Sequence, residues 1–79
     1  MPKDVGLERL FGRILQKLRT ERGLSQEELG FESNYHRTYI SQLERGQKNP
    51  SLKAIFRLAK ALGVKPSGMI RRIESRMEE

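Results

Sequence analysis

Hydrophobic residues recur at helical spacing along most of this 79-residue chain. From Leu7 to Leu18 they repeat at i, i+3, i+4, i+7, i+8 and i+11, which places one broad apolar stripe on a first helix. We expect Gly23 to end that helix. No segment alternates between apolar and polar residues as a half-buried strand would. The pattern therefore predicts an all-α chain of five helices that forms a single domain over residues 1–79.

A second helix is predicted to begin at Gln26, because Ser25 and Glu28 have the spacing of a capping box. Its one large apolar residue is Leu29, and Gly30 follows directly. A glycine inside so short a helix costs up to about 1 kcal/mol of helix propensity relative to alanine. We therefore expect another backbone to approach Gly30 closely, in preference to simple tolerance of a poor helix former.

A third helix is predicted over about residues 37–45. Asn34 can adopt a left-handed turn conformation before it, and Gly46 can stop it. Ile40 and Leu43 form its inward pair, so most of its early polar side chains project outward. Two short helices joined by a tight turn, with polar residues on the outer side of the second, are typical of a helix-turn-helix DNA reader.

Two more helices follow. Ser51 is the expected N-cap of the fourth, and Gly63 is its expected end. This fourth helix is predicted to bury six residues: Leu52, Ile55, Phe56, Leu58, Ala59 and Leu62.

The fifth helix, over about residues 66–77, is favoured by Pro66 in its first turn. Met69, Ile70, Ile73 and Met77 are spaced along one stripe. We expect Ile73 and Met77 to extend beyond the core of so small a domain and to remain exposed unless something covers them.

The composition agrees with one small domain. With 35% hydrophobic residues, a chain of this length has room for one core, which buries about 60% of its unfolded surface. Sixteen Lys and Arg against ten Asp and Glu give a net charge of +6, which suits a polyanionic partner but is a weak signal alone. Because there is no cysteine, helix packing must supply the stability without disulfides or thiolate metal ligands.

The runs H-R-T-Y-I-S-Q-L-E-R-G at residues 36–46 and N-P-S-L at residues 49–52 resemble the Cro/phage-repressor class of helix-turn-helix proteins, often called the XRE family. The nearest likeness is to small restriction-modification controller proteins, and it covers roughly residues 7–70. It implies a five-helix, lambda-repressor-like DNA-binding domain whose helices two and three form the helix-turn-helix. His36 departs from the small capping residue that is usual at the start of the third helix.

The resemblance implies a homodimer, in which a second copy of the chain covers the C-terminal helix at about residues 66–77. The other interpretation of those apolar positions is a frayed tail. Two recognition helices about 34 Å apart meet successive major grooves on one face of B-DNA, so a two-fold dimer reads an inverted-repeat operator.

Three residues of the third helix are candidates for reading bases. The planar fork of Arg37 can donate twice to guanine O6 and N7, and its alternative role is a phosphate clamp. Thr38 can bond to a base edge or pack its methyl group against thymine. Gln42, one turn further, could pair with adenine or simply face the solvent, and we rank it behind Thr38.

Six residues are candidates for phosphate contacts, which should set affinity and salt sensitivity more than sequence choice. Gln26 lies at a helix start, where amides and the helix dipole favour an anion, and the resemblance implies a backbone contact there. The hydroxyl of Tyr39 could donate to a phosphate, or its ring could support the third helix from the side. The remaining candidates are Arg45, Lys48, Asn49 and Lys53.

Other candidate roles are structural. The resemblance implies a partly buried ion pair between Arg19 and Glu44 that holds the reader helix in place. Phe31 is an aromatic residue at a position that usually faces solvent, so we hypothesise that it packs in the dimer interface or against the fifth helix. Together with Ile73 and Met77, it makes up the predicted interface.

No catalytic, metal or cofactor site is expected, because the only histidine, His36, has no cysteine to pair with and no phosphate-cradling glycine loop or metal-ligand cluster occurs. We expect no small-molecule effector, no membrane span and no signal peptide, and hence a cytoplasmic protein. The leading interpretation is a homodimeric transcription regulator; the controller-protein likeness implies that it acts on its own promoter. Two alternatives stay open: the antitoxin of a toxin-antitoxin pair, and a protein-interaction module that has kept the fold.

Overall fold

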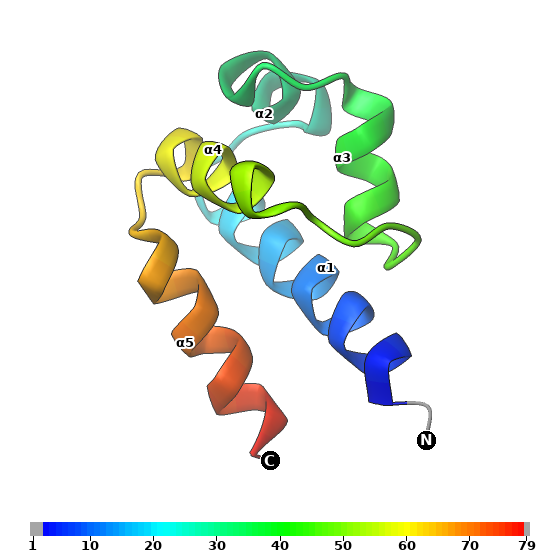
Figure 1. Cartoon of the computed structure of the whole chain (residues 1–79). Coiled ribbons are helices and arrows are strands. Elements are labelled where there is room, and N and C mark those ends of the chain that lie inside the picture. The colour runs from blue at the N-terminus through cyan, green and yellow to red at the C-terminus, as the bar shows by residue number, and fades with distance from the viewer. Residues whose placement is uncertain (1–2, 79) are drawn as a thin grey trace.

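The computed structural model describes residues 3–78, and it describes side chains from residue 6 onward. These residues form five helices and no strand, so the predicted all-α class is confirmed. They are α1 (Lys3–Glu21), α2 (Gln26–Ser33), α3 (Arg37–Glu44), α4 (Leu52–Leu62) and α5 (Pro66–Met77). In Figure 1, α3 and α5 lie on opposite sides of α1, while α2 and α4 lie near its C-terminal end.

The helix ends are set by local capping, largely as the sequence predicts. The Ser25 hydroxyl accepts from the Glu28 amide at 3.0 Å, and the Glu28 carboxylate accepts from the Ser25 amide at 2.8 Å, which completes the capping box of α2. Asn34 is left-handed with φ 66°, and Gly46 has φ 73° just after α3. The last helical residue of α3 is Glu44, one residue earlier than predicted.

At two glycines, the backbone of another segment lies where a side chain would otherwise be. A Cβ added to Gly30 would lie 2.5 Å from the carbonyl oxygen of Tyr35, so the predicted close approach is confirmed. Gly12 was not singled out from the sequence, yet a Cβ there would lie 2.5 Å from the carbonyl oxygens of both Leu43 and Glu44. The end of α3 therefore rests directly on α1, which fixes the orientation of α3.

The core draws on all of the helices. Its largest fully buried side chains are Leu15, Leu29, Ile40, Leu43, Leu58 and Met69. Ile73 is only 7% exposed within one chain, so the prediction that it extends beyond the core is wrong. The reason is that α5 packs along α1 instead of docking by its first turn alone. Met77, one turn later, is 63% exposed, as predicted.

The predicted inner face of α4 needs a correction. Leu52 is 72% exposed and Phe56 is 56% exposed, so the prediction that both are buried is wrong. Ala54 and Ala61 are buried instead, next to Leu58. The apolar stripe of α4 is wider than the surface its neighbours cover, and the small alanines occupy the side of closest packing. One apolar edge of α4 therefore remains uncovered in a single chain.

Within residues 3–78, none of the helices has the length and apolar character needed to cross a membrane.

Candidate nucleic-acid interface

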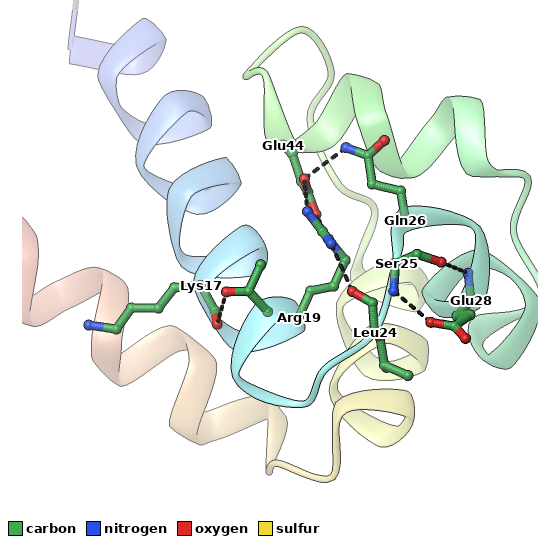
Figure 2. Close-up of polar contacts among 8 residues, drawn as sticks. Lys17, Arg19, Leu24, Ser25, Gln26, Glu28 and Glu44 are labelled. Atoms are coloured by element: carbon green, nitrogen blue, oxygen red, sulfur yellow. Dashed lines mark hydrogen bonds and ion pairs between the residues drawn. The ribbon is translucent and has the colours of Figure 1, made fainter.

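A buried ion pair joins α3 to α1. The Arg19 guanidinium donates to both Glu44 carboxylate oxygens, from Nε at 2.6 Å and from Nη2 at 3.1 Å. The side chains of Arg19 and Glu44 are only 11% and 3% exposed. Nη1 of Arg19 also donates to the Leu24 carbonyl at 2.8 Å, in the loop before α2. The geometry agrees with the predicted pair and ties α1, the following loop and α3 together (Figure 2).

Gln26 extends this network to the start of α2. Its side-chain amide donates to Glu44 Oε1 at 2.9 Å, as Figure 2 shows. Glu44 therefore accepts three hydrogen bonds from two side chains, which satisfies a carboxylate that water hardly reaches. The bond also fixes the position of Gln26 beside α3, with its amide oxygen not used in the network.

A shallow cleft lies along the outer side of α3, next to the start of α2. It is lined by Gln26, Arg37, Thr38, Ser41 and Arg45. Four of these were predicted to contact DNA: Arg37 and Thr38 as base readers, and Gln26 and Arg45 as phosphate contacts. The fold brings all four to one cleft. Ser41 was not predicted. Its position one turn after Arg37 could have indicated it, because residues four apart share a helix face.

The start of α3 is capped by an unusual residue. Nδ1 of His36 accepts from the Thr38 amide at 3.0 Å, so this histidine is the N-cap of α3 in place of a smaller residue. The cap fixes the first turn of α3, which presents Arg37 and Thr38 to the exterior; both are exposed.

Tyr39 lies on the flank of α3 and supports it. Its ring centroid is 4.8 Å from that of Tyr35, and the ring is partly buried against the core. Burial raises the pKa of the Tyr39 hydroxyl, Tyr35 adds to the rise, and a hydrogen bond with the Ser51 backbone opposes it. The hydroxyl therefore stays protonated at neutral pH and remains a donor. These contacts favour the supporting role of the ring, while a phosphate contact stays a prediction.

The remaining polar candidates lie outside the cleft. Gln42 is half-buried, and its carbonyl accepts from the Gln47 amide at 2.9 Å where α3 ends. Lys48 and Lys53 are exposed, on the loop after α3 and in the first turn of α4. Asn49 is also exposed, but it lines an apolar groove on the side of α5.

That apolar groove runs between α1, α5 and the start of α4. It is lined by Leu7, Glu8, Phe11, Asn49, Pro50, Ile55, Ile70, Ile73, Glu74 and Met77. Three large side chains of this lining are exposed: Leu7 at 44%, Ile70 at 42% and Met77 at 63%. Leu52 and Phe56 are also exposed, and they flank the groove residue Ile55 in the sequence of α4. We call these five exposed residues the apolar face.

Phe31 is not part of the groove. It is 87% exposed on α2, so the hypothesis that it packs against the fifth helix is wrong. Its side chain points away from the core because Leu29 and Gly30 occupy the inner side of this short helix. Its place in a dimer interface stays a prediction.

Comparisons with known proteins point to one family. The family described as "Helix-turn-helix" matches residues 15–69. The control protein C.BamHI of Bacillus amyloliquefaciens is 47% identical over 62 residues, which is 77% of this chain and 76% of that protein. The restriction-modification controller protein C.AhdI of Aeromonas hydrophila has a TM-score of 0.75 at 48% identity, covering 77% of this chain and 92% of that one.

A further solved structure is the tetramer of the controller protein C.Esp1396I in complex with its natural 35 base-pair operator. Its chain has a TM-score of 0.83 at 30% identity, and the likeness covers 92% of this chain and 96% of that one.

Proposed function

Because the chain belongs to the helix-turn-helix family, we propose that it is a sequence-specific transcriptional regulator that binds an inverted-repeat operator as a homodimer. The likeness to C.BamHI and C.AhdI supports the more specific role of a restriction-modification controller acting on its own promoter. The C.Esp1396I structure supports operator binding by an oligomer, since that protein is held on its operator as a tetramer.

The observation that carries the proposal is the cleft on the outer side of α3. It gathers a guanidinium, two hydroxyls and a side-chain amide from Arg37, Thr38, Ser41 and Gln26, beside a second guanidinium from Arg45. These are the donors and acceptors that read base edges and phosphates in a major groove. Because α3 is anchored from behind by Arg19 and Glu44, the groups are held in a fixed arrangement before DNA arrives.

Position supports the proposed division of labour for Arg37 and Thr38, which line the cleft, while Gln42 and Asn49 lie outside it and keep the roles predicted from the sequence. Arg37, Thr38 and Gln42 read bases. Phosphates are held by the second set: Gln26, Tyr39, Arg45, Lys48, Asn49 and Lys53. The exposed cations Lys48 and Lys53 extend the contact beyond the cleft to the flanking backbone. In this role the protein catalyses no reaction. It acts in the cytoplasm, where its DNA partner is.

The proposed dimer surface is the apolar face together with the groove beside it. Five large apolar side chains exposed on so small a domain favour coverage by another molecule. The faces of α4 and α5 that carry Leu52, Phe56, Ile70 and Met77 point away from the core, so they can meet their counterparts across a two-fold axis. Ile73 contributes from the floor of the groove, where it is largely covered by its own chain.

Selection of bound sequences from random duplex DNA tests the function directly. Purified protein is incubated with the pool at near-physiological salt, and the survivors are sequenced. We expect enrichment of an inverted repeat whose half-sites lie about one helical turn apart, and the same site upstream of the protein's own gene. Weak, salt-sensitive binding without any enriched sequence would instead favour a protein-interaction role.

Two alanine variants separate base reading from phosphate binding. Arg37→Ala should lose about 1–3 kcal/mol of discrimination at one base pair of each half-site, because its fork can no longer pair with a base. Lys48→Ala should weaken binding to all sequences alike and reduce the salt slope by about one phosphate contact. Titrations of the selected site and its single-base variants at several salt concentrations measure both effects.

Arg13→Ala is the matched control, since it removes an exposed cation from α1 on the outer surface of the protein. It should leave the base preference unchanged and should lower the affinity for DNA less than the Arg37 and Lys48 variants do. Equal loss of specificity in the Arg37 and Lys48 variants would refute the assigned roles.

A further inference from the structure

A second cluster of cations lies between α1 and α5, away from the cleft on α3. Lys17 of α1 and Arg72 and Arg76 of α5 line one small hollow of about 200 Å³. Ser75 supplies a hydroxyl to the same hollow, and the buried Ile14 lies at its base. Figure 2 shows the side chain of Lys17 leaving α1 on the side of α5, opposite to Arg19 and Glu44. We call this hollow the α1–α5 basic pocket.

The cluster is unusual because none of its three cations forms an ion pair with a described carboxylate. The lining includes no carboxylate, and among the described side chains the only ion pair within 4.0 Å is Arg19–Glu44. Glu74 lies between Arg72 and Arg76 in the sequence but lines the apolar groove on the other flank of α5. Like charges one helical turn apart repel each other. An anion in the pocket would remove this repulsion.

The helix dipole does not account for the arrangement. Arg76 is in the last turn of α5, where a cation is favourable. Arg72 is in the middle of α5, and Lys17 precedes the last turn of α1, whose basic residue is Arg19. The dipole effect is confined to the terminal turns, so two of the three cations gain nothing from it.

We propose that the α1–α5 basic pocket binds a phosphate group. Two guanidinium groups can each donate a pair of parallel hydrogen bonds to phosphate oxygens, and Lys17 adds a compact charge from the facing helix. The Ser75 hydroxyl is a further donor within the same lining. A bound phosphate links α5 to α1 and so holds the helix that carries Ile70 and Met77 in place.

A titration with inorganic phosphate, without DNA, tests the site. The amide signals of residues 72–76 and Lys17 are followed by NMR, with potassium chloride at equal ionic strength as the reference. We expect saturable shifts at these residues, at lower phosphate concentrations than any shifts around α3, and a higher melting temperature in phosphate than in chloride. Shifts spread over all basic surfaces, without saturation, would overturn the proposal.

The decisive variant is Lys17→Gln/Arg72→Gln/Arg76→Gln. Its matched control is Arg13→Gln/Lys65→Gln/Arg71→Gln, which removes the same charge from exposed positions outside the pocket. The pocket variant should bind phosphate at least about tenfold more weakly than the control variant, because charge-assisted hydrogen bonds are lost. Equal phosphate affinity in the two variants would overturn the proposal. The comparison holds even if the two variants differ in melting temperature, provided that both are folded at the temperature of the titration.

The source of the phosphate is decided with DNA of random sequence, as duplexes of 15 and 40 base pairs. If the pocket takes a phosphate of the DNA backbone, the pocket variant should lose more affinity for the long duplex than the control variant does. Equal affinities of the two variants for both duplexes would identify a separate phosphate compound as the ligand. The phosphate titration uses no DNA, so its outcome is independent of the proposed operator binding.

Discussion

Replacing Glu44 by alanine should lower the free energy of unfolding by about 3–5 kcal/mol, because it leaves the largely buried Arg19 guanidinium without its counter-charge. Glu44 accepts from Arg19 at 2.6 and 3.1 Å and from Gln26 at 2.9 Å, so one substitution breaks three hydrogen bonds. Arg19 keeps its bond to the Leu24 carbonyl, which favours the lower end of this range. Urea unfolding followed by circular dichroism measures the effect.

Glu27→Ala is the matched control, since it removes an exposed carboxylate from the first turn of α2. We expect it to change stability by less than about 1 kcal/mol. Replacing both partners, as in Arg19→Leu/Glu44→Leu, should recover part of the loss because no unpaired charge remains. A loss below about 1 kcal/mol for Glu44→Ala would show that water or a rearranged partner already compensates the charge.

The Glu44 variant also separates stability from recognition. Glu44 lies on the inner side of α3 and Arg37 lines the outer cleft. At a temperature where Glu44→Ala is still folded, it should bind DNA more weakly and yet keep the base preference of the original protein. Arg37→Ala should show the opposite result, with unchanged stability and a relaxed preference.

Local signals in the sequence were sufficient for the helices. The Ser25–Glu28 capping box, the left-handed Asn34 and the glycine after α3 each depend on atoms within a few residues of one another. For this reason the start of α2 was predicted to the residue, and the predicted bounds of α3 agree with the structure to within one residue. His36 shows the limit of residue-type rules, since its ring nitrogen caps α3 in place of a small side chain.

Tertiary coverage was harder to predict. Periodicity showed that Leu52 and Phe56 belong to the apolar stripe of α4, and that Ile73 belongs to that of α5, but not which neighbours cover them. In the structure α5 packs along α1 and buries Ile73, whereas no neighbouring helix covers Leu52 and Phe56. Gly12 was missed for the same reason, because its role depends on a carbonyl group of α3 more than 30 residues away in sequence.

In the candidate site, too, local positions could be predicted and contacts between helices could not. Helix periodicity placed Arg37 and Thr38 on the outer side of α3, and the fold adds Gln26 and Ser41 to the same cleft. The bond between Gln26 and Glu44 could not be predicted, because it requires the start of α2 to meet the end of α3. Lys17 and the arginines of α5 likewise form a cluster only once α1 and α5 are packed.

Converting the apolar face to an acidic one should abolish both dimer formation and tight operator binding. In Ile70→Glu/Met77→Glu the new carboxylates would oppose their counterparts across the two-fold axis, and burying them unpaired is unfavourable. Both residues are substantially exposed in one chain, so the fold should survive. Sedimentation equilibrium should give a mass near the 9.2 kDa of one chain, whereas we expect twice that mass for the original protein.

Loss of the dimer should reduce operator affinity by about 10²- to 10⁴-fold, because the second half-site is then no longer bound intramolecularly. Gln16→Glu/Ser67→Glu, which adds the same charge at exposed positions outside the groove, should remain dimeric and keep its affinity. Phe31→Ser tests whether Phe31 lies in the dimer interface. Weaker dimerisation would place it there, and unchanged dimerisation and melting temperature would exclude it. If the acidic double variant still formed dimers, the interface would lie elsewhere, and the exposed edge of α2 around Phe31 would be the next surface to test.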